Sequence, residues 1–334
     1  MISRIESGGR PRRIAIDCDP GVDDALALAL ALVCPKVEIQ AVTTGHGNVP
    51  ARWACRNARR WLELCRAHLP EGWPLPTVYR GAAGPLRPRR VDRSISLAIH
   101  GEDGLGGLAS GGRPALPRSA PVGPPPAHLR LLELARTWGR SLTVVALGPL
   151  TNLALAVRRD PAALRRVGRI VVMGGAARMP GNATAAAEFN IHCDPEAAAA
   201  VFACGAPVTL VGLDVTRRVV LSSRALGGGG SFRRLVRRLT RPYIDYSKRN
   251  RGTDGCVLHD PLALGEAVRP GFLRCARRRV EVECGNGPAR GMTVVDLRPG
   301  REALGGAGVE VALEVDAPRF LRFFLSRLRT YRGG

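Results

Sequence analysis

Short β-branched and apolar runs alternate along this chain with longer Ala- and Leu-rich stretches of helical periodicity. Each apolar run is followed by a polar or glycine-rich turn, which is typical of buried strands. The expected strands cover residues 13–17, 37–43, 142–146, 169–173 and 208–211. This alternation predicts an α/β fold with an open, mostly parallel, Rossmann-like sheet and helices on both faces.

Polar residues and tight turns follow the ends of these expected strands. Asp17 and Asp19 follow the first strand, Asn48 the second and Asp214 the last, while glycine turns follow the other two. Ligands of open α/β sheets bind beyond the carboxyl ends of the strands. We therefore expect the active site at that edge of the sheet.

The turn after the first strand reads D-C-D-P-G-V-D-D, so it carries the carboxylates of Asp17, Asp19, Asp23 and Asp24 within eight residues. Carboxylates this close repel one another unless a cation or strong hydrogen-bond donors neutralise them. An oxygen-only ligand set suits Ca²⁺ or Mg²⁺ better than zinc. The alternative is a helix N-cap beside a solvated acidic loop.

Length and composition suit one large domain. The 334 residues are 45% hydrophobic, and we assign residues 13–330 to a single domain that follows a basic tail, residues 1–12. Residues 109–128 are rich in Pro and Gly and predict a surface loop. A glycine run at 227–230 precedes a basic amphipathic stretch, which we interpret as a mobile flap over residues 227–250.

The net charge of +22 comes almost entirely from arginine, since Lys36 and Lys248 are the only lysines. Aromatic residues, which stack on bases, make up 4% of the chain, so we interpret the charge as a solvated surface without a nucleic-acid partner. The longest apolar run, residues 25–34, is too short for a bilayer span. The first 13 residues lack the apolar core of a secretory signal, and no C-x-x-C pair occurs among the nine cysteines. These features predict a cytoplasmic protein with reduced thiols and no membrane partner.

Five further segments carry polar residues in a fixed order. They are T-G-H-G-N at 44–48, H-G-E-D-G-L-G-G at 100–107, G-P-L-T-N at 148–152, the stretch from Asn182 to E-F-N at 188–190, and H-D-P-L-A at 259–263. Each segment alone is weak evidence, because an isolated Asn or Glu is more often a cap and an isolated His is often structural. Together with the acidic turn, this order resembles the inosine-uridine-preferring nucleoside hydrolases from about residue 13 to residue 328.

The resemblance implies a calcium-dependent enzyme that hydrolyses the N-glycosidic bond of ribonucleosides. It implies that Asp19 is both a Ca²⁺ ligand and the base that activates water, with Asp24, Asp260 and the Leu147 carbonyl as further ligands. It places His259 as proton donor to the leaving base and His100 near that base. The positions matching the ribose site are Asp23, Asn48, Met173, Asn182, Glu188 and Asn190.

The resemblance also bears on specificity and assembly. Purine-specific members are similar but hold the base with tryptophans, whereas this chain has His259 and His100 at the corresponding places. This favours substrates of the uridine and inosine type. In the expected flap, Tyr243 and Tyr246 are the candidates to touch the base. The resemblance also implies that the chain forms a homodimer or homotetramer.

Two alternatives remain open at this stage. D-x-D after an apolar strand also begins the haloacid-dehalogenase-like, Mg²⁺-dependent phosphatases, although Pro20-Gly21 replaces their usual Gly-Thr. The net charge alone would fit a basic nucleic-acid-binding protein without enzymatic activity, for which salt-dependent binding to DNA is the expected sign.

Overall fold

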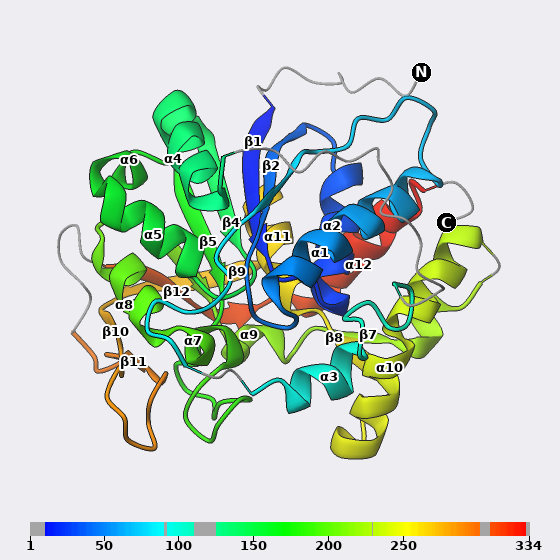
Figure 1. Cartoon of the computed structure of the whole chain (residues 1–334). Helices are drawn as coiled ribbons and strands as arrows, with labels where there is room; N and C mark the ends of the chain where they lie inside the picture. Colours follow the sequence, from blue (N-terminus) through cyan, green and yellow to red (C-terminus); the bar gives the residue numbers. More distant parts are fainter. Residues whose placement is uncertain (1–10, 90–91, 110–124, 229, 301–307, 332–334) are drawn as a thin grey trace.

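The computed structural model describes residues 11–89, 92–109, 125–228, 230–300 and 308–331. Its centre is an eight-stranded sheet in the order β3-β2-β1-β4-β5-β6-β12-β9, in which only β9 runs antiparallel to its neighbour (Figure 1). The strands are β1 (Arg12–Cys18), β2 (Val37–Thr44), β3 (Val78–Arg80), β4 (Leu142–Ala146), β5 (Arg169–Met173), β6 (Val208–Val211), β9 (Leu273–Arg278) and β12 (Val309–Val315).

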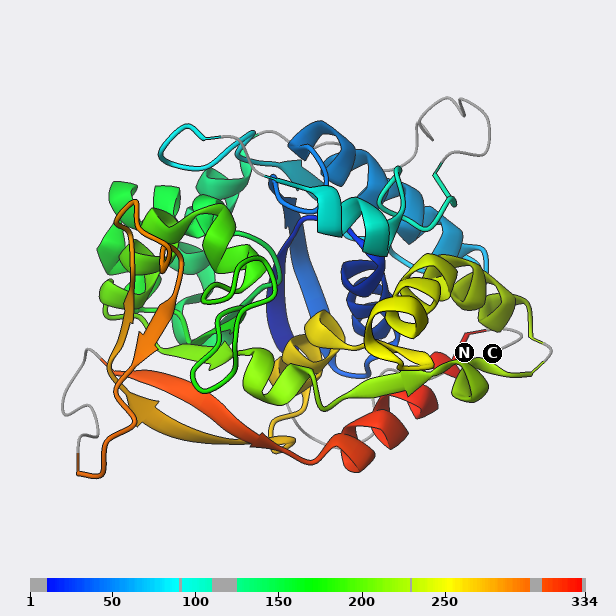
Figure 2. The same cartoon turned by 90° about the horizontal axis from the view of Figure 1, so that it is seen from below.

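Helices cover both faces of this sheet, and Figure 2 shows the two layers on either side of the strands. One layer contains α1 (Val22–Val33), α2 (Ala51–Arg66), α10 (Ser231–Arg251), α11 (His259–Val268) and α12 (Ala317–Leu328). The other layer contains α4 (Ala127–Trp138), α5 (Thr151–Arg159), α6 (Pro161–Arg165) and α8 (Pro195–Ala203).

Strand β1 is an internal strand of the sheet, since it pairs with β2 on one edge and with β4 on the other. Ile14 and Ile16 pack into the core under α1, while Ala15 packs into the core on the opposite face. Asp17 pairs in register with Thr43 of β2 and Ala146 of β4. The acidic turn therefore emerges between the carboxyl ends of two neighbouring parallel strands.

Short elements surround this edge of the sheet. They are α3 (Ser94–His100), α7 (Phe189–Cys193), α9 (Leu213–Thr216), the antiparallel pair β7 (Val220–Ser222) and β8 (Gly255–Val257), and the hairpin β10 (Val280–Val282) with β11 (Thr293–Val295). Two 3₁₀ turns, Gly139–Ser141 and Ser223–Leu226, complete the described elements.

All five expected strands are confirmed to within one residue at each end, as is the mostly parallel sheet with helices on both faces. Strands β3, β9 and β12 were not expected: β3 has three residues, β9 is half arginine, and β12, V-E-V-A-L-E-V, shows an alternation of apolar and charged residues instead of a continuous apolar run. Within the described residues, no helix is both long and apolar enough to cross a membrane.

The expected basic tail, surface loop and flap are described only in part or remain untested. Residues 1–10 of the expected tail and residues 110–124 of the expected surface loop lie outside the described residues. The expected flap contains helix α10, whose first turn is anchored by Phe232 stacked on Tyr331, with ring centroids 3.7 Å apart. Mobility of residues 227–250 stays a prediction.

Candidate active site

The acidic turn folds back on itself through Asp24. Its Oδ1 accepts a hydrogen bond from the backbone N–H of Asp19 at 3.2 Å, and its Oδ2 accepts one from Gly21 at 2.9 Å. A carboxylate at the start of α1 also meets the positive end of the helix dipole. Hydrogen bonds within the turn itself therefore hold the Asp24 carboxylate in place, without any ligand.

Asp19 is fully buried, and its two carboxylate oxygens differ. Oδ2 accepts a hydrogen bond from the backbone N–H of Asn48 at 2.5 Å, whereas Oδ1 has no partner within the described residues. A Cβ on Gly148 would lie 2.5 Å from Oδ1, so glycine is needed there to leave room for the carboxylate. Burial, followed by repulsion from Asp24, raises the pKa of Asp19 well above its ordinary value.

Three buried carboxylates form a group that could hold a cation. Asp23, Asp24 and Asp260, the second residue of α11, each place one oxygen within 4.8 Å of the others. Burial, followed by repulsion from Asp24, raises the pKa of Asp23 to about 8. Burial is also the main reason that the pKa of Asp24 and that of Asp260 are raised.

This arrangement fits a metal ion, because buried carboxylates without a counter-charge are costly and one oxygen of Asp19 lacks any partner. The three clustered carboxylates are those of Asp23, Asp24 and Asp260, whereas the sequence predicts Asp19, Asp24 and Asp260 as ligands. The predicted carbonyl ligand, Leu147, follows β4 directly, and its oxygen accepts a hydrogen bond from Asn190 Nδ2 at 2.7 Å. The identity of the ion is taken up under the proposed function.

A cavity opens beside these carboxylates. Every predicted site residue lines it except Asp19 and Asp24, which are fully buried in the acidic turn. The cavity is lined by Asp23, Asn48, Ile95, Ser96, Ile99, His100, Leu147, Met173, Asn182, Glu188, Phe189, Asn190, Tyr243, Arg251, His259 and Asp260. Residues at the ends of β1, β2, β4 and β5 therefore meet the short helices α3 and α7 and the longer helices α10 and α11, at the edge that the strand pattern predicts.

The polar residues opposite the acidic turn are held by backbone groups. Glu188 caps α7, and its Oε2 accepts from the N–H groups of Gly175 at 3.0 Å and Ile191 at 3.2 Å. Asn182 Oδ1 accepts from the N–H of Phe189 at 2.8 Å. These side chains are oriented before a ligand arrives, which lowers the cost of ordering them on binding.

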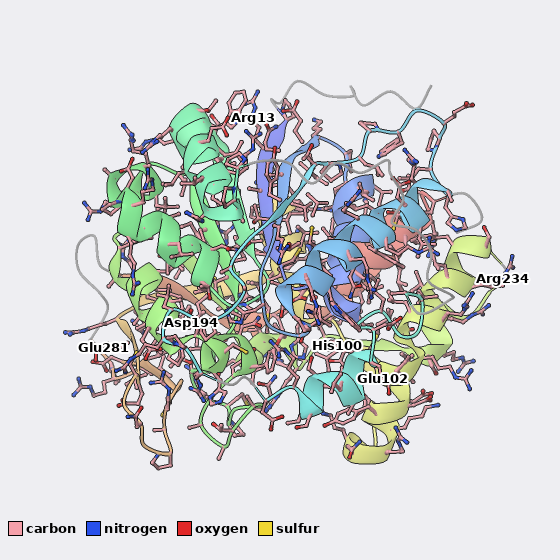
Figure 3. All side chains as sticks on the ribbon, in the orientation of Figure 1. Arg13, His100, Glu102, Asp194, Arg234 and Glu281 are labelled. Carbon is pink, nitrogen blue, oxygen red and sulfur yellow. The ribbon has the colours of Figure 1, made fainter. Side chains whose placement is uncertain are left out.

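Two histidines flank the cavity, and Figure 3 shows His100 on the helix α3 side. His100 Nδ1 accepts from the backbone N–H of Val22 at 3.0 Å. His259 Nδ1 lies 2.8 Å from the Thr216 hydroxyl. Burial lowers the pKa of each to about 3, and for His259 the positive charges of Arg251 and Arg217 add to this effect. Both imidazoles are therefore neutral at neutral pH in the ligand-free protein.

Asp17 lies behind the turn and contacts its supports. It accepts hydrogen bonds from the Thr43 hydroxyl at 2.6 Å and from Asn152 Nδ2 at 2.8 Å, and burial raises its pKa to about 6. These bonds tie the ends of β1 and β2 to the start of α5, which agrees with an orienting role.

A second buried chain of hydrogen bonds supports the loop that carries Asn48. The Thr151 hydroxyl donates to Asp194 Oδ2 at 2.7 Å, so it accepts from His46 Nε2 at 2.9 Å. Asp194 also accepts from the backbone of Leu86 and Ala197. His46 therefore carries its proton on Nε2, and burial lowers its pKa to about 4.

Sequence reasoning missed Thr216, which contacts His259, and several residues that line the cavity. Thr216 follows β6 by a few residues, where the rule that ligands bind at strand ends could have indicated it. Arg251, the last residue of α10, and Ile95 and Ile99 of α3 gave no such signal. Of the two expected base contacts, Tyr243 lines the cavity, but Tyr246 is absent from its lining.

Comparison with known proteins now decides the family. The profile described as "Inosine-uridine preferring nucleoside hydrolase" matches residues 14–322. The chain belongs to this nucleoside hydrolase family. It is an N-glycosidase, and the phosphatase alternative is thereby set aside.

Relatives of this nucleoside hydrolase cover nearly its whole length. It is 37% identical over 95% of its residues to the pyrimidine-specific ribonucleoside hydrolase RihA of Salmonella gallinarum, and covers 98% of that protein. It is 35% identical over 96% of its residues to a probable uridine nucleosidase 2 of Arabidopsis thaliana, again covering 98%. A solved structure, the purine-preferring ribonucleoside hydrolase from Gardnerella vaginalis, superposes with a TM-score of 0.82 at 33% identity, with 95% of this chain and 98% of that chain covered.

Proposed function

We propose that this nucleoside hydrolase uses Ca²⁺ and prefers nucleosides of the uridine and inosine type. The observation that carries the proposal is the cavity in which the carboxylates of Asp23 and Asp260 face polar side chains from two other loops. A ribose ring, whose hydroxyls both donate and accept hydrogen bonds, suits such a site.

Calcium is the ion of choice because every candidate ligand atom is an oxygen. The ligands would be Asp19, Asp24, Asp260 and the Leu147 carbonyl, with Asp23 close enough to join them. Ca²⁺ accepts more oxygen ligands, in looser geometry, than Mg²⁺ does. When bound, the cation would polarise and orient the attacking water.

The chain's own residues would perform the remaining steps. Asp19, with its unpartnered buried oxygen, would accept the proton of the water. Asp23, Asn48, Met173, Asn182, Glu188 and Asn190 would hold the ribose, and the anionic members would stabilise the positive charge that develops on the sugar. The bond from sugar to base then breaks without a covalent intermediate.

His259 is proposed as the proton donor to the leaving base. To donate a proton the ring must be in its imidazolium form once nucleoside is bound, with Nδ1–H donated to the Thr216 hydroxyl 2.8 Å away and Nε2–H left for the base. The cavity has two aromatic walls, Phe189 and Tyr243, and no tryptophan among its described lining residues. This composition supports the uridine and inosine type, as does the name of the pyrimidine-specific relative from Salmonella.

The test is release of free ribose from a panel of nucleosides by the metal-depleted protein, before and after addition of Ca²⁺, Mg²⁺ or Zn²⁺. We expect Ca²⁺ to restore activity and uridine or inosine to be the best substrates. Asp19→Ala should abolish activity, while Asp245→Ala, which removes an exposed carboxylate on α10, should leave it unchanged. Full activity of the metal-free protein, or of Asp19→Ala, would refute the mechanism.

A homodimer or homotetramer is part of the same proposal and rests on the family resemblance alone. Light scattering of the purified protein measures its mass directly. A mass equal to one chain of 35.6 kDa across the working concentration range would contradict it.

A further inference from the structure

A second cavity lies at the edge of the sheet away from the active site. It is formed where β4, β5, β6 and β12 begin, between the 3₁₀ turn that carries Arg140 and the last turn of α6. Figure 3 shows Arg13, near the start of β1, at the opposite end of the sheet from His100. Since β1 runs parallel to β4, this groove and the active site lie at opposite ends of the strands.

The groove is distinguished by its charge. It has a volume of about 710 Å³, and its described lining contains five arginines and one carboxylate, Glu310. Two other surface cavities have similar volumes but balanced or acidic linings. One of about 690 Å³ has Arg66 beside Glu63 and Glu71. The other, of about 790 Å³, has two arginines and two carboxylates.

Two of the five arginines are already compensated. Arg169 donates to the Thr209 hydroxyl at 2.9 Å and lies 3.5 Å from the Glu266 carboxylate. Arg277 stands directly across the β9–β12 pair from Glu310, where opposite charges attract. The positive charges of Arg169 and Arg277 are therefore largely balanced, and the net positive charge of the groove comes from the other three arginines.

The other three arginines are Arg140, Arg165 and Arg166. Arg165 donates Nε to the carbonyl of Cys204 at 2.8 Å, which fixes the guanidinium and leaves its terminal nitrogens unused. Arg140 and Arg166 make no side-chain hydrogen bond or ion pair within the described residues. Asp160 is held by Arg136 at 2.8 Å, and its pKa is lowered first by Arg136 and to a smaller extent by the charge of Arg166.

We propose that this groove binds the phosphate chain of a nucleoside di- or triphosphate. Guanidinium groups recognise phosphate oxygens through paired hydrogen bonds, and three arginines that form no ion pair within the described residues match a ligand with several negative charges. The volume falls in the range of small-molecule sites. Exposed Pro207 offers an apolar surface beside the arginines for the nucleoside part. The groove's described lining contains no aromatic residue, which disfavours single-stranded nucleic acid.

The test is equilibrium dialysis of labelled ATP against the calcium-loaded protein at physiological salt, with Ca²⁺ in excess of nucleotide and ribose added to occupy the catalytic cavity. We expect one equivalent of ATP to bind. The variant R140S/R166S should bind at least about tenfold more weakly. The control R158S/R159S removes two exposed arginines of α5 outside the groove and should bind like the unaltered protein.

Competition identifies the part of the ligand that is recognised. Displacement by tripolyphosphate as effective as that by unlabelled ATP would assign the site to the phosphate chain from any source, and weaker displacement would assign it to nucleotides. Absence of binding, equal binding by all three proteins, or tighter binding of an oligonucleotide would overturn the proposal. Uridine hydrolysis by R140S/R166S should stay unchanged, so failure here is separable from failure of the catalytic assignment.

Discussion

The imidazole of His100 accepts a hydrogen bond through Nδ1 from the backbone N–H of Val22, at 3.0 Å. Val22 is the first residue of α1, whose N-terminal N–H groups lack partners within the helix. A residue that the sequence places beside the nucleobase therefore also holds the acidic turn in place.

This contact predicts opposite outcomes for two substitutions of His100. Asn places its side-chain oxygen near the position of Nδ1, so His100→Asn should keep the bond to Val22. Gln extends toward Nε2, so His100→Gln should leave a buried N–H unpaired and cost about 1–3 kcal/mol of stability. Thermal unfolding of the two variants measures the difference. If both variants melt together, the bond to Val22 contributes nothing to stability.

Gly148 predicts a mutation that disturbs Asp19 without replacing it. Gly148→Ala would place a methyl group 2.5 Å from Asp19 Oδ1, so the carboxylate must move. We expect a large loss of uridine hydrolysis and weaker Ca²⁺ binding by calorimetry. The matched control is Gly84→Ala, because a Cβ there has no neighbour within 4 Å. Normal activity of Gly148→Ala would remove Asp19 from the proposed mechanism.

The raised carboxylate pKa values predict that stabilisation by Ca²⁺ grows with pH. Without metal, folding raises the pKa of Asp17 to about 6 and that of Asp23 to about 8 from 3.8. A group whose pKa rises on folding favours the folded state below its unfolded pKa, and this contribution is lost as the pH rises through the folded value.

The metal-free protein should therefore lose stability between about pH 4 and pH 8, while bound Ca²⁺ offsets the repulsion among the ionised carboxylates. The measurement is the melting temperature of metal-depleted protein, with and without added Ca²⁺, at pH 5, 6.5 and 8. The difference should widen at each step, and Mg²⁺ should produce a smaller one. A difference independent of pH would contradict the assignment of these carboxylates to the cation.

The acid role of His259 predicts a dependence on the leaving group. His259→Ala should slow hydrolysis of uridine or inosine by about 10²–10⁴-fold and spare p-nitrophenyl riboside, whose leaving group needs no proton. Thr216→Val, which removes the partner of Nδ1, should show a smaller loss with the same preference. Equal losses on both substrates would assign His259 a structural role beside Asp260.

Closure of the predicted flap can be followed by hydrogen exchange. Tyr243 and Arg251 bring the second half of α10 to the cavity, whereas Phe232 anchors the first half in the core. Pro242 lies between the halves and interrupts the helical hydrogen bonds. A ribose-mimicking inhibitor should slow exchange in residues after Pro242. Equal exchange with and without inhibitor would count against a flap.

The sequence predicts the centre of this fold well because buried parallel strands are nearly continuous in apolar residues, as in β1, β4 and β5. It fails at β9, an edge strand in which three of the six residues of LRCARR are arginines and none is buried. Among site residues, those in the acidic turn follow from charge density, but Arg251 could not be found this way. Its approach to His259 depends on where a helix of 21 residues ends.

Cys18, at the end of β1, is 2% exposed and sits among the carboxylates of the acidic turn. Burial, followed by repulsion from Asp24, raises the pKa of its thiol well above 9.0. A thiol that does not ionise reacts slowly with alkylating agents and oxidants. Burial, followed by repulsion from Glu266, also raises the pKa of the Cys275 thiol, to about 11, but Cys275 on β9 is exposed. Accessibility should therefore direct a labelling reagent to Cys275 and leave the acidic turn unmodified.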